Sequence, residues 1–172
     1  MVYGGIIAVI IFFIIYCRIK KIDLFETADI FMPQVSIAQA FGRVGCFLAG
    51  CCYGAETTSP IGIVFPYGSI APAGVKLWPT QLMSAGGNLI IAAILFAVSY
   101  FAYKKKAKGI VLSSYLILYG VGRFIIEFFR NDARGSVGAL STSQFISIFI
   151  VIGGVGFLIY RINSTKKQKL NN

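Results

Sequence analysis

Five apolar runs, each about as long as a membrane-crossing helix, constrain this chain more than any other feature of its sequence. They cover residues 1–17, 27–51, 79–103, 109–129 and 142–160. The hydrocarbon core of a bilayer is about 30 Å thick and takes a helix of about 20 residues. Only 13% of the residues are charged, against roughly 25% in a soluble domain. We therefore predict an all-α, polytopic membrane protein, in which residues 1–172 form a single integral domain of about five transmembrane helices.

The basic residues lie at the ends of these runs and predict the orientation of the chain. Eleven of the 16 lysines and arginines fall in three segments, 18–21, 104–108 and 161–169. The positive-inside rule places these segments in the cytoplasm and the first residue outside. An outside start is unusual, so we expect further helices upstream. The net charge of +10 does not indicate nucleic-acid binding, because the sequence lacks the interleaved basic and aromatic residues used on RNA.

The second run, 27–51, is expected to form a broken or kinked helix. Pro33 removes one backbone donor, and Gly42, Gly45 and Gly50 weaken the end of the run. Irregular backbone at membrane depth is tolerated where it lines a cavity, so we expect a cavity here. Residues 53–78 are richer in Pro, Gly, Ser and Thr, which predicts an outside loop near the site with a short strand at 61–65.

Two arginines, Arg43 and Arg123, lie inside the predicted spans. A charge at bilayer depth is costly and marks a functional site by default. At 1.5 Å per residue, both lie about 10–12 Å below the outer surface. Two guanidinium groups at one depth can hold a lipid phosphate through paired donors, whereas the alternative is that each side chain reaches up to the interface. The matched depth favours phosphate binding, and Gly42, Gly45 and Gly54 let a ligand approach the backbone closely.

Three further polar residues extend this candidate site. Glu127 follows Arg123 by four residues, so the two side chains share a helix face. Such a carboxylate either forms a plain intrahelical ion pair or, once desolvated, accepts a proton. Arg130 continues the polar patch to the surface. Gln81 either hydrogen-bonds a lipid headgroup or contacts a neighbouring helix.

The chain has four cysteines, Cys17, Cys46, Cys51 and Cys52, and no histidine. The spacing of the last three fits none of the common zinc patterns, so neither a metal site nor a cofactor is predicted. Small, polarisable packing residues are the favoured interpretation. The alternative is a redox-active or disulfide-forming pair on the oxidising side.

Four stretches along the chain form a pattern: Tyr3-Gly4-Gly5, the run from Gly42 to Gly54, Pro79-Thr80-Gln81-Leu82, and the run from Tyr119 to Arg130. This pattern resembles the prolipoprotein diacylglyceryl transferase family. Its members are bacterial inner-membrane enzymes that transfer diacylglycerol from phosphatidylglycerol to the lipobox cysteine of a prolipoprotein. The resemblance implies this activity, these two partners within the lipid bilayer, and a multi-pass location in the bacterial plasma membrane with the site facing the outer leaflet. It also implies an N-terminally truncated, divergent member.

The resemblance further implies roles for particular residues. Arg43 and Arg123 would hold the lipid phosphate, Glu127 would orient Arg123, and Tyr3 would complete the catalytic set. The residues implied to bind phosphatidylglycerol are Gly42, Arg43, Gly45, Cys46, Gly54, Gln81, Arg123 and Arg130. The reaction would be attack of the cysteine thiolate on the glyceryl carbon, with glycerol-1-phosphate leaving and the arginines stabilising the phosphate charge.

The chain departs from the family pattern at positions where members carry polar side chains. Cys46, Ala49 and Cys51 stand in place of Asn, Asn and Glu, and Tyr3 stands where many members have His. These changes leave open a second interpretation, a non-catalytic lipid-binding relative. A third interpretation is a thiol-redox membrane protein that uses Cys46, Cys51 and Cys52, although the chain lacks a C-x-x-C pair.

Overall fold

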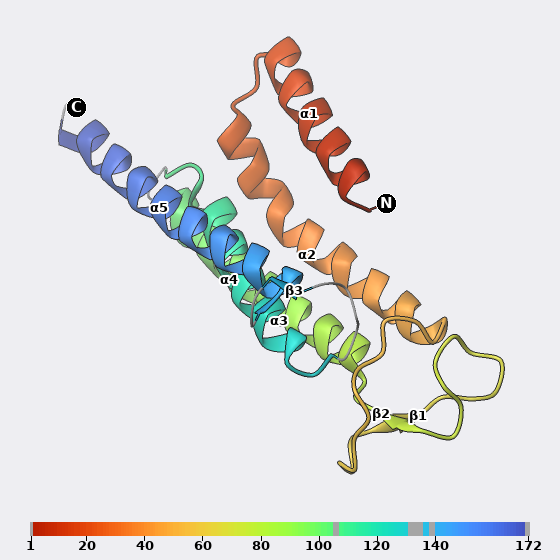
Figure 1. The fold of residues 1–172 in the computed structure, drawn as a ribbon. Coiled ribbons are helices and arrows are strands. Elements are labelled where there is room, and N and C mark those ends of the chain that lie inside the picture. Colours follow the sequence, from red (N-terminus) through yellow and green to blue (C-terminus); the bar gives the residue numbers. More distant parts are fainter. Residues whose placement is uncertain (1, 105–106, 131–135, 138–139, 171–172) are drawn as a thin grey trace.

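The computed structural model describes residues 2–104, 107–130, 136–137 and 140–170, and most of them are helical (Figure 1). The five helices are α1 (Val2–Lys20), α2 (Leu24–Leu48), α3 (Thr80–Lys104), α4 (Ile110–Glu127) and α5 (Thr142–Leu170). Each occupies one predicted run, and α5 alone extends well beyond its expected end. Helices α3 and α4 and residues Thr142–Thr165 of α5 are long and apolar enough to cross a membrane. The prediction of an all-α membrane protein is confirmed.

Of the two alternatives expected for α2, a broken or a kinked helix, the structure excludes the break. Asp23 caps its first turn by accepting hydrogen bonds from the backbone N–H groups of Phe25 and Glu26, and the helix then continues through Pro33 to Leu48. A proline removes only one hydrogen bond from a helix, and Pro33 is fully buried in the packed structure. The irregular backbone therefore lies after the helix and not within it.

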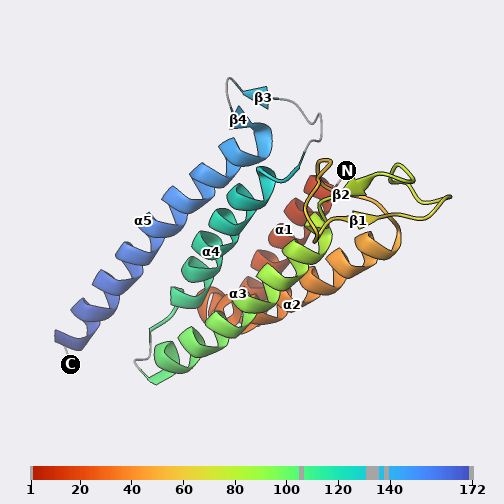
Figure 2. The same ribbon diagram turned by 90° about the horizontal axis from the view of Figure 1, so that it is seen from below.

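The helices α2, α3, α4 and α5 pack in chain order, and α2 also contacts α4. Figure 2 shows these four helices running side by side. Helix α1 is joined to α2 by a short turn and makes little contact with the rest of the bundle. The largest apolar cluster lies between α3 and α4 and is built around Ile91, Leu95, Val111 and Tyr115. Many other large apolar side chains are exposed, as expected of helices that face lipid.

Two small antiparallel sheets cover the connections. Strand β1 (Ile63–Val64) pairs with β2 (Lys76–Leu77) in the long loop between α2 and α3. The short strand expected in this loop is therefore present, although it is shorter than predicted. Strand β3 (Ser136–Val137) pairs with β4 (Leu140–Ser141) just before α5.

The segments predicted to lie in the cytoplasm meet at one end of the bundle. The ammonium group of Lys108 lies 3.1 Å from the carboxylate of Asp23 and 2.8 Å from that of Glu26. Arg161 Nε donates a 2.6 Å hydrogen bond to the carbonyl of Lys108. These contacts join the α1–α2 turn, the α3–α4 connection and α5, as an up-and-down chain requires.

Candidate functional site

The structure brings Arg43 and Arg123 to one cavity. Arg43 reaches it from α2 and Arg123 from α4, and α3 supplies Ser84 and Asn88 to the wall between them. Gly87, Ile91, Tyr119, Gly122 and Ile126 complete the lining. Two positive charges in a mostly apolar pocket repel each other, so an anion bound between them would lower the energy of both. The two arginines that were predicted to act together therefore line the same cavity.

Arg123 is held by groups from two helices. Its Nη2 lies 3.3 Å from Glu127 Oε2 and donates a 3.2 Å hydrogen bond to Ser143 Oγ. The other carboxylate oxygen of Glu127 accepts a 3.1 Å hydrogen bond from Ser141 Oγ. Glu127 is 9% exposed, so this is a buried ion pair with a second partner and not a surface contact. The carboxylate fixes the guanidinium from one side and leaves the cavity side for a ligand.

The serines that support this pair were missed from the sequence, although a signal was present. Ser141-Thr142-Ser143-Gln144 matches the capping box, in which the first and fourth residues bond each other's backbone N–H. The structure shows both bonds, from Gln144 N–H to Ser141 Oγ at 3.1 Å and from Ser141 N–H to Gln144 Oε1 at 3.0 Å. This capping box fixes the start of α5. It thereby places the hydroxyl of Ser143 beside Arg123 and that of Ser141 beside Glu127. Asn88, a polar residue within an apolar run, was also overlooked.

The glycines divide into two groups. A Cβ atom added at Gly42 or Gly45 would meet nothing within 4 Å, so both positions are open. Neither glycine is among the residues that line the arginine cavity, and their predicted contact with lipid stays a prediction. Gly54 is different, because an added Cβ would lie 2.6 Å from the carbonyl oxygen of Phe129 and 2.6 Å from Cβ of Trp78. Protein atoms therefore pack closely on Gly54, and its role in lipid binding stays a prediction.

Gln81 also contacts protein. It is 1% exposed, and its amide Nε2 donates a 2.8 Å hydrogen bond to the carbonyl of Cys51. Gln81 is not among the residues that line the arginine cavity. The structure shows the contact within the protein, and the headgroup contact stays a prediction. Arg130 lies in the turn after α4, outside the cavity lining, where its backbone N–H bonds the carbonyl of Glu127 at 3.2 Å. The side chain of Tyr3 lies outside the described part of the structure.

A larger cavity of about 440 Å³ lies at the other end of α2, α3 and α4. Glu26, Asp29, Tyr103 and Lys108 are among its lining residues. It brings carboxylates together where the first cavity brings two arginines together. The two cavities therefore differ in charge as well as in size.

Fold and site together define a helical membrane protein with a paired-arginine cavity between its spans. The family model for prolipoprotein diacylglyceryl transferase matches residues 1–160, and the chain belongs to this family. It is 52% identical over 170 residues to phosphatidylglycerol–prolipoprotein diacylglyceryl transferase 2 of Clostridium perfringens. That match covers 98% of this chain and 64% of the relative. It is 44% identical over 168 residues to the transferase of Clostridium tetani, covering 98% of this chain and 66% of that one.

A third relative, the phosphatidylglycerol–prolipoprotein diacylglyceryl transferase of Finegoldia magna, is 40% identical over 154 residues. That match covers 90% of this chain and 58% of the relative. The chain thus spans between 58% and 66% of the length of these three relatives, less than two thirds in each case. Family and apolar helices together identify a bacterial membrane protein.

Proposed function

We propose that this protein transfers the diacylglyceryl group of phosphatidylglycerol to the lipobox cysteine of a prolipoprotein. The observation that carries the proposal is the meeting of Arg43 and Arg123 in one cavity, although they come from different helices. The relatives named above support the choice of substrates, since their names state phosphatidylglycerol and prolipoprotein. No cofactor or metal is needed for this displacement.

In the proposed reaction, the two guanidinium groups hold the phosphate of the lipid. The cysteine thiolate of the prolipoprotein attacks the glyceryl carbon that carries the phosphate ester. A carbon–sulfur bond forms, the carbon–oxygen bond breaks, and glycerol-1-phosphate leaves with the electron pair. Donors aimed at the departing phosphate stabilise the charge that develops there. The thiol gives up its proton before attack, because the thiolate is the nucleophile.

Glu127 acts in this scheme as a positioning residue. Its ion pair with Arg123 and its bond from Ser141 fix the guanidinium before lipid arrives. A guanidinium that is already oriented lowers the activation barrier of the transfer, because the side chain need not reorganise during the reaction.

The direct test is lipid transfer by the chain in vesicles of radiolabelled phosphatidylglycerol with a lipobox peptide. Arg123→Ala and Arg43→Ala should each lower the rate by about 10²-fold or more, the usual effect of removing one donor to a developing charge. Arg18→Ala is the matched control, since Arg18 is an exposed arginine at the end of α1. Equal rates for Arg123→Ala and the control would refute the proposal.

A second candidate function is lipid binding without turnover. Cys46 and Cys51 replace polar family residues close to the site, which favours this candidate over other non-enzymatic roles. It predicts that the chain binds phosphatidylglycerol, that Arg43→Ala and Arg123→Ala weaken binding, and that no label reaches the peptide. Measuring binding and transfer on the same preparation separates the two functions.

We further propose that the cavity faces the outer leaflet of the plasma membrane. The basic segments gather at the opposite end of the bundle, and basic residues favour the cytoplasmic side. Tyr67, which is 92% exposed in the loop between α2 and α3, gives a test in a cysteine-free background. A cysteine introduced as Tyr67→Cys should react with an impermeant maleimide in intact cells, whereas Ser164→Cys should react only after lysis. The reverse pattern would overturn the orientation.

A further inference from the structure

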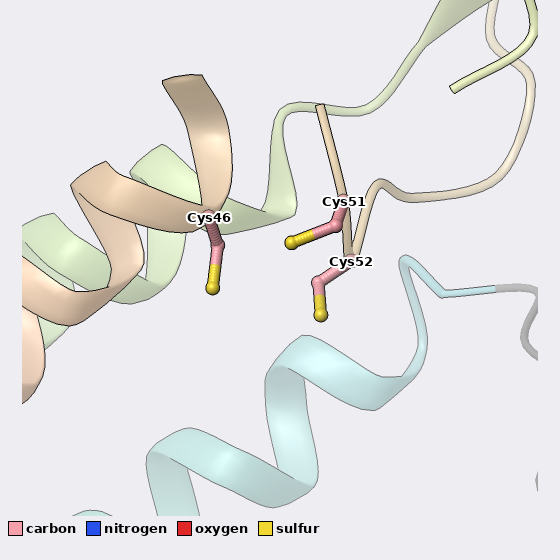
Figure 3. Close-up of side chains that lie close together, drawn as sticks. All are labelled: Cys46, Cys51 and Cys52. Atoms are coloured by element: carbon pink, nitrogen blue, oxygen red, sulfur yellow. The ribbon is translucent and has the colours of Figure 1, made fainter. Parts of the chain in front are cut away.

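Three cysteine thiols meet just beyond the last turn of α2. Cys46 lies within the helix, and Cys51 and Cys52 lie in the turn that follows it. Their Sγ atoms all lie within 4.8 Å of one another, and all three residues are partly exposed. Figure 3 shows the side chain of Cys51 pointing toward Cys46, while the side chains of Cys46 and Cys52 point in nearly the same direction on either side of it.

The backbone that carries these thiols is fixed at several points. Cys51 N–H bonds the carbonyl of Cys46 at 3.0 Å. The carbonyls of Cys51 and Cys52 accept hydrogen bonds from Gln81 Nε2 at 2.8 Å and from Thr80 Oγ1 at 3.0 Å. Cys52 has a φ of 59°, a left-handed conformation that non-glycine residues rarely adopt. Folding therefore brings the three sulfurs together before any ligand binds.

We propose that Cys46, Cys51 and Cys52 form a binding site for one soft, thiophilic metal ion of the Cu(I) class. A metal–sulfur distance of about 2.3 Å gives sulfur–sulfur separations of about 4 Å in a three-coordinate site. The observed limit of 4.8 Å is close to this spacing, so small side-chain rotations complete the site. On binding, each thiol releases its proton to solvent and the thiolate donates an electron pair to the ion, with no change of oxidation state.

The ligand set favours Cu(I) over zinc. Structural zinc sites are almost always tetrahedral, with four protein ligands. The chain has no histidine, and the group that the structure brings together contains three thiols and no carboxylate. Soft thiolates bind both Cu(I) and zinc, so the number of ligands decides, and a site of three thiols suits Cu(I), which accepts low coordination. A disulfide between Cys51 and Cys52 is disfavoured, because adjacent Cα atoms are about 3.8 Å apart and disulfides usually need 4.4 Å or more.

This site goes beyond the proposed transferase function and does not rest on it. The two are nevertheless adjacent, because Cys46 follows Arg43 by three residues and so lies on the same side of α2. An ion bound to all three thiols would tie the end of α2 to the following turn. It would thereby restrict the helix that carries Arg43.

Metal binding is tested by titrating the reduced, detergent-solubilised chain anaerobically with Cu(I) in competition with bathocuproine disulfonate. The wild-type chain should take up one ion and gain a thiolate-to-copper absorption band in the ultraviolet. The triple variant Cys46→Ser, Cys51→Ser, Cys52→Ser should lose both. Cys17→Ser is the matched control, since Cys17 lies on α1 and is 2% exposed, and should keep both. Equal uptake by the triple variant, or failure of the wild-type chain to compete, would overturn the proposal.

Two further measurements keep the test decisive if the triple variant fails to fold. In the wild-type chain, Cu(I) should protect Cys46, Cys51 and Cys52 from alkylation, as read by mass spectrometry, and lack of protection would contradict the site. Gln81→Leu, which removes the bond to the carbonyl of Cys51, should raise the Kd for Cu(I), because the turn that carries Cys51 is then held less firmly. Tighter binding of Zn(II) than of Cu(I) by the same chain would overturn the choice of ion.

Discussion

Asp29 on α2 accepts a 2.6 Å hydrogen bond from the backbone N–H of Gly109, 80 positions away in the sequence. Its second oxygen accepts a 2.8 Å bond from the N–H of Leu112. Gly109 is the N-cap residue of α4 and has no side chain to satisfy these donors. Asp29 thus caps α4 from another helix. This contact fixes the position of α4 along α2, and therefore the position of Arg123 on α4 relative to Arg43 on α2.

Replacing Asp29 should therefore destabilise the whole bundle. Asp29→Ala leaves two N–H groups at the start of α4 without acceptors, and each buried unsatisfied group costs about 1–3 kcal/mol. Asp29→Asn keeps one acceptor oxygen and should lose less. Thermal unfolding in a maltoside detergent measures both variants against the wild-type chain. Equal midpoints for Asp29→Ala and the wild-type chain would show that water, and not Asp29, satisfies these donors.

Gly54 and Gly45 should respond differently to alanine. Gly54→Ala places Cβ 2.6 Å from the carbonyl oxygen of Phe129, and an overpacked position of this kind costs about 1–3 kcal/mol of stability. Gly45→Ala meets nothing within 4 Å, so its unfolding midpoint should be unchanged or slightly higher. If lipid approaches Gly45 closely, Gly45→Ala should also weaken phosphatidylglycerol binding while leaving stability intact. Loss of stability by Gly45→Ala with intact binding would contradict both expectations.

Hydrophobic runs predicted the five helices because burial in lipid depends on length and composition, which a single sequence displays. Arg43 and Arg123 could be paired in advance because their depth follows from helix rise. The continuity of α2 through Pro33 could not be predicted, since it depends on how the buried proline packs in the folded chain. The roles of Gly54 and Gln81 were also hidden. Each contacts protein brought from a distant segment, and a glycine that admits ligand looks the same in sequence as one that admits backbone.

The convergence of the three thiols was hidden for a related reason. Spacing along the chain could be compared only with known zinc patterns, which Cys46, Cys51 and Cys52 do not match. The left-handed turn at Gly50 and Cys52 folds the segment back on the end of α2. Nothing in the composition of the turn indicates that conformation for a cysteine.

Glu127→Gln should reveal whether Arg123 binds phosphate. The substitution removes the charge opposite Arg123 while keeping an acceptor for Ser141, and should destabilise the chain by about 1.5–3 kcal/mol, the range for a hydrogen bond to a charged group. A bound phosphate would replace the lost negative charge. Phosphatidylglycerol should therefore raise the unfolding midpoint of Glu127→Gln more than that of the wild-type chain. Diacylglycerol, which lacks the phosphate, is the control lipid, and an equal response to both lipids would count against phosphate binding.

The contacts of Asp23 predict a pH dependence at the other end of the bundle. The backbone N–H of Glu26, together with Lys108, holds the pKa of Asp23 below its ordinary value of 3.8. Because the folded-state pKa is the lower one, this contribution to stability is present above about pH 4 and is lost as the pH falls through the folded-state pKa. Asp23→Asn keeps the helix cap but lacks the charge. It should be less stable than the wild-type chain by about 0.2–1 kcal/mol at pH 7, the range for an exposed ion pair.

This difference between Asp23→Asn and the wild-type chain should shrink as the pH is lowered from 7 to about 3, because protonation of the carboxylate removes the charge that distinguishes the two side chains. It should also shrink at high salt, since the side chains of Asp23 and Lys108 are 43% and 42% exposed and screening weakens surface pairs. Thermal unfolding at both pH values, with and without added salt, measures the effect. Glu56→Gln, at an exposed acidic residue at the opposite end of the bundle, controls for the general effect of acid. A gap between Asp23→Asn and the wild-type chain that widens on acidification would mean that the Lys108 contact does not stabilise the fold.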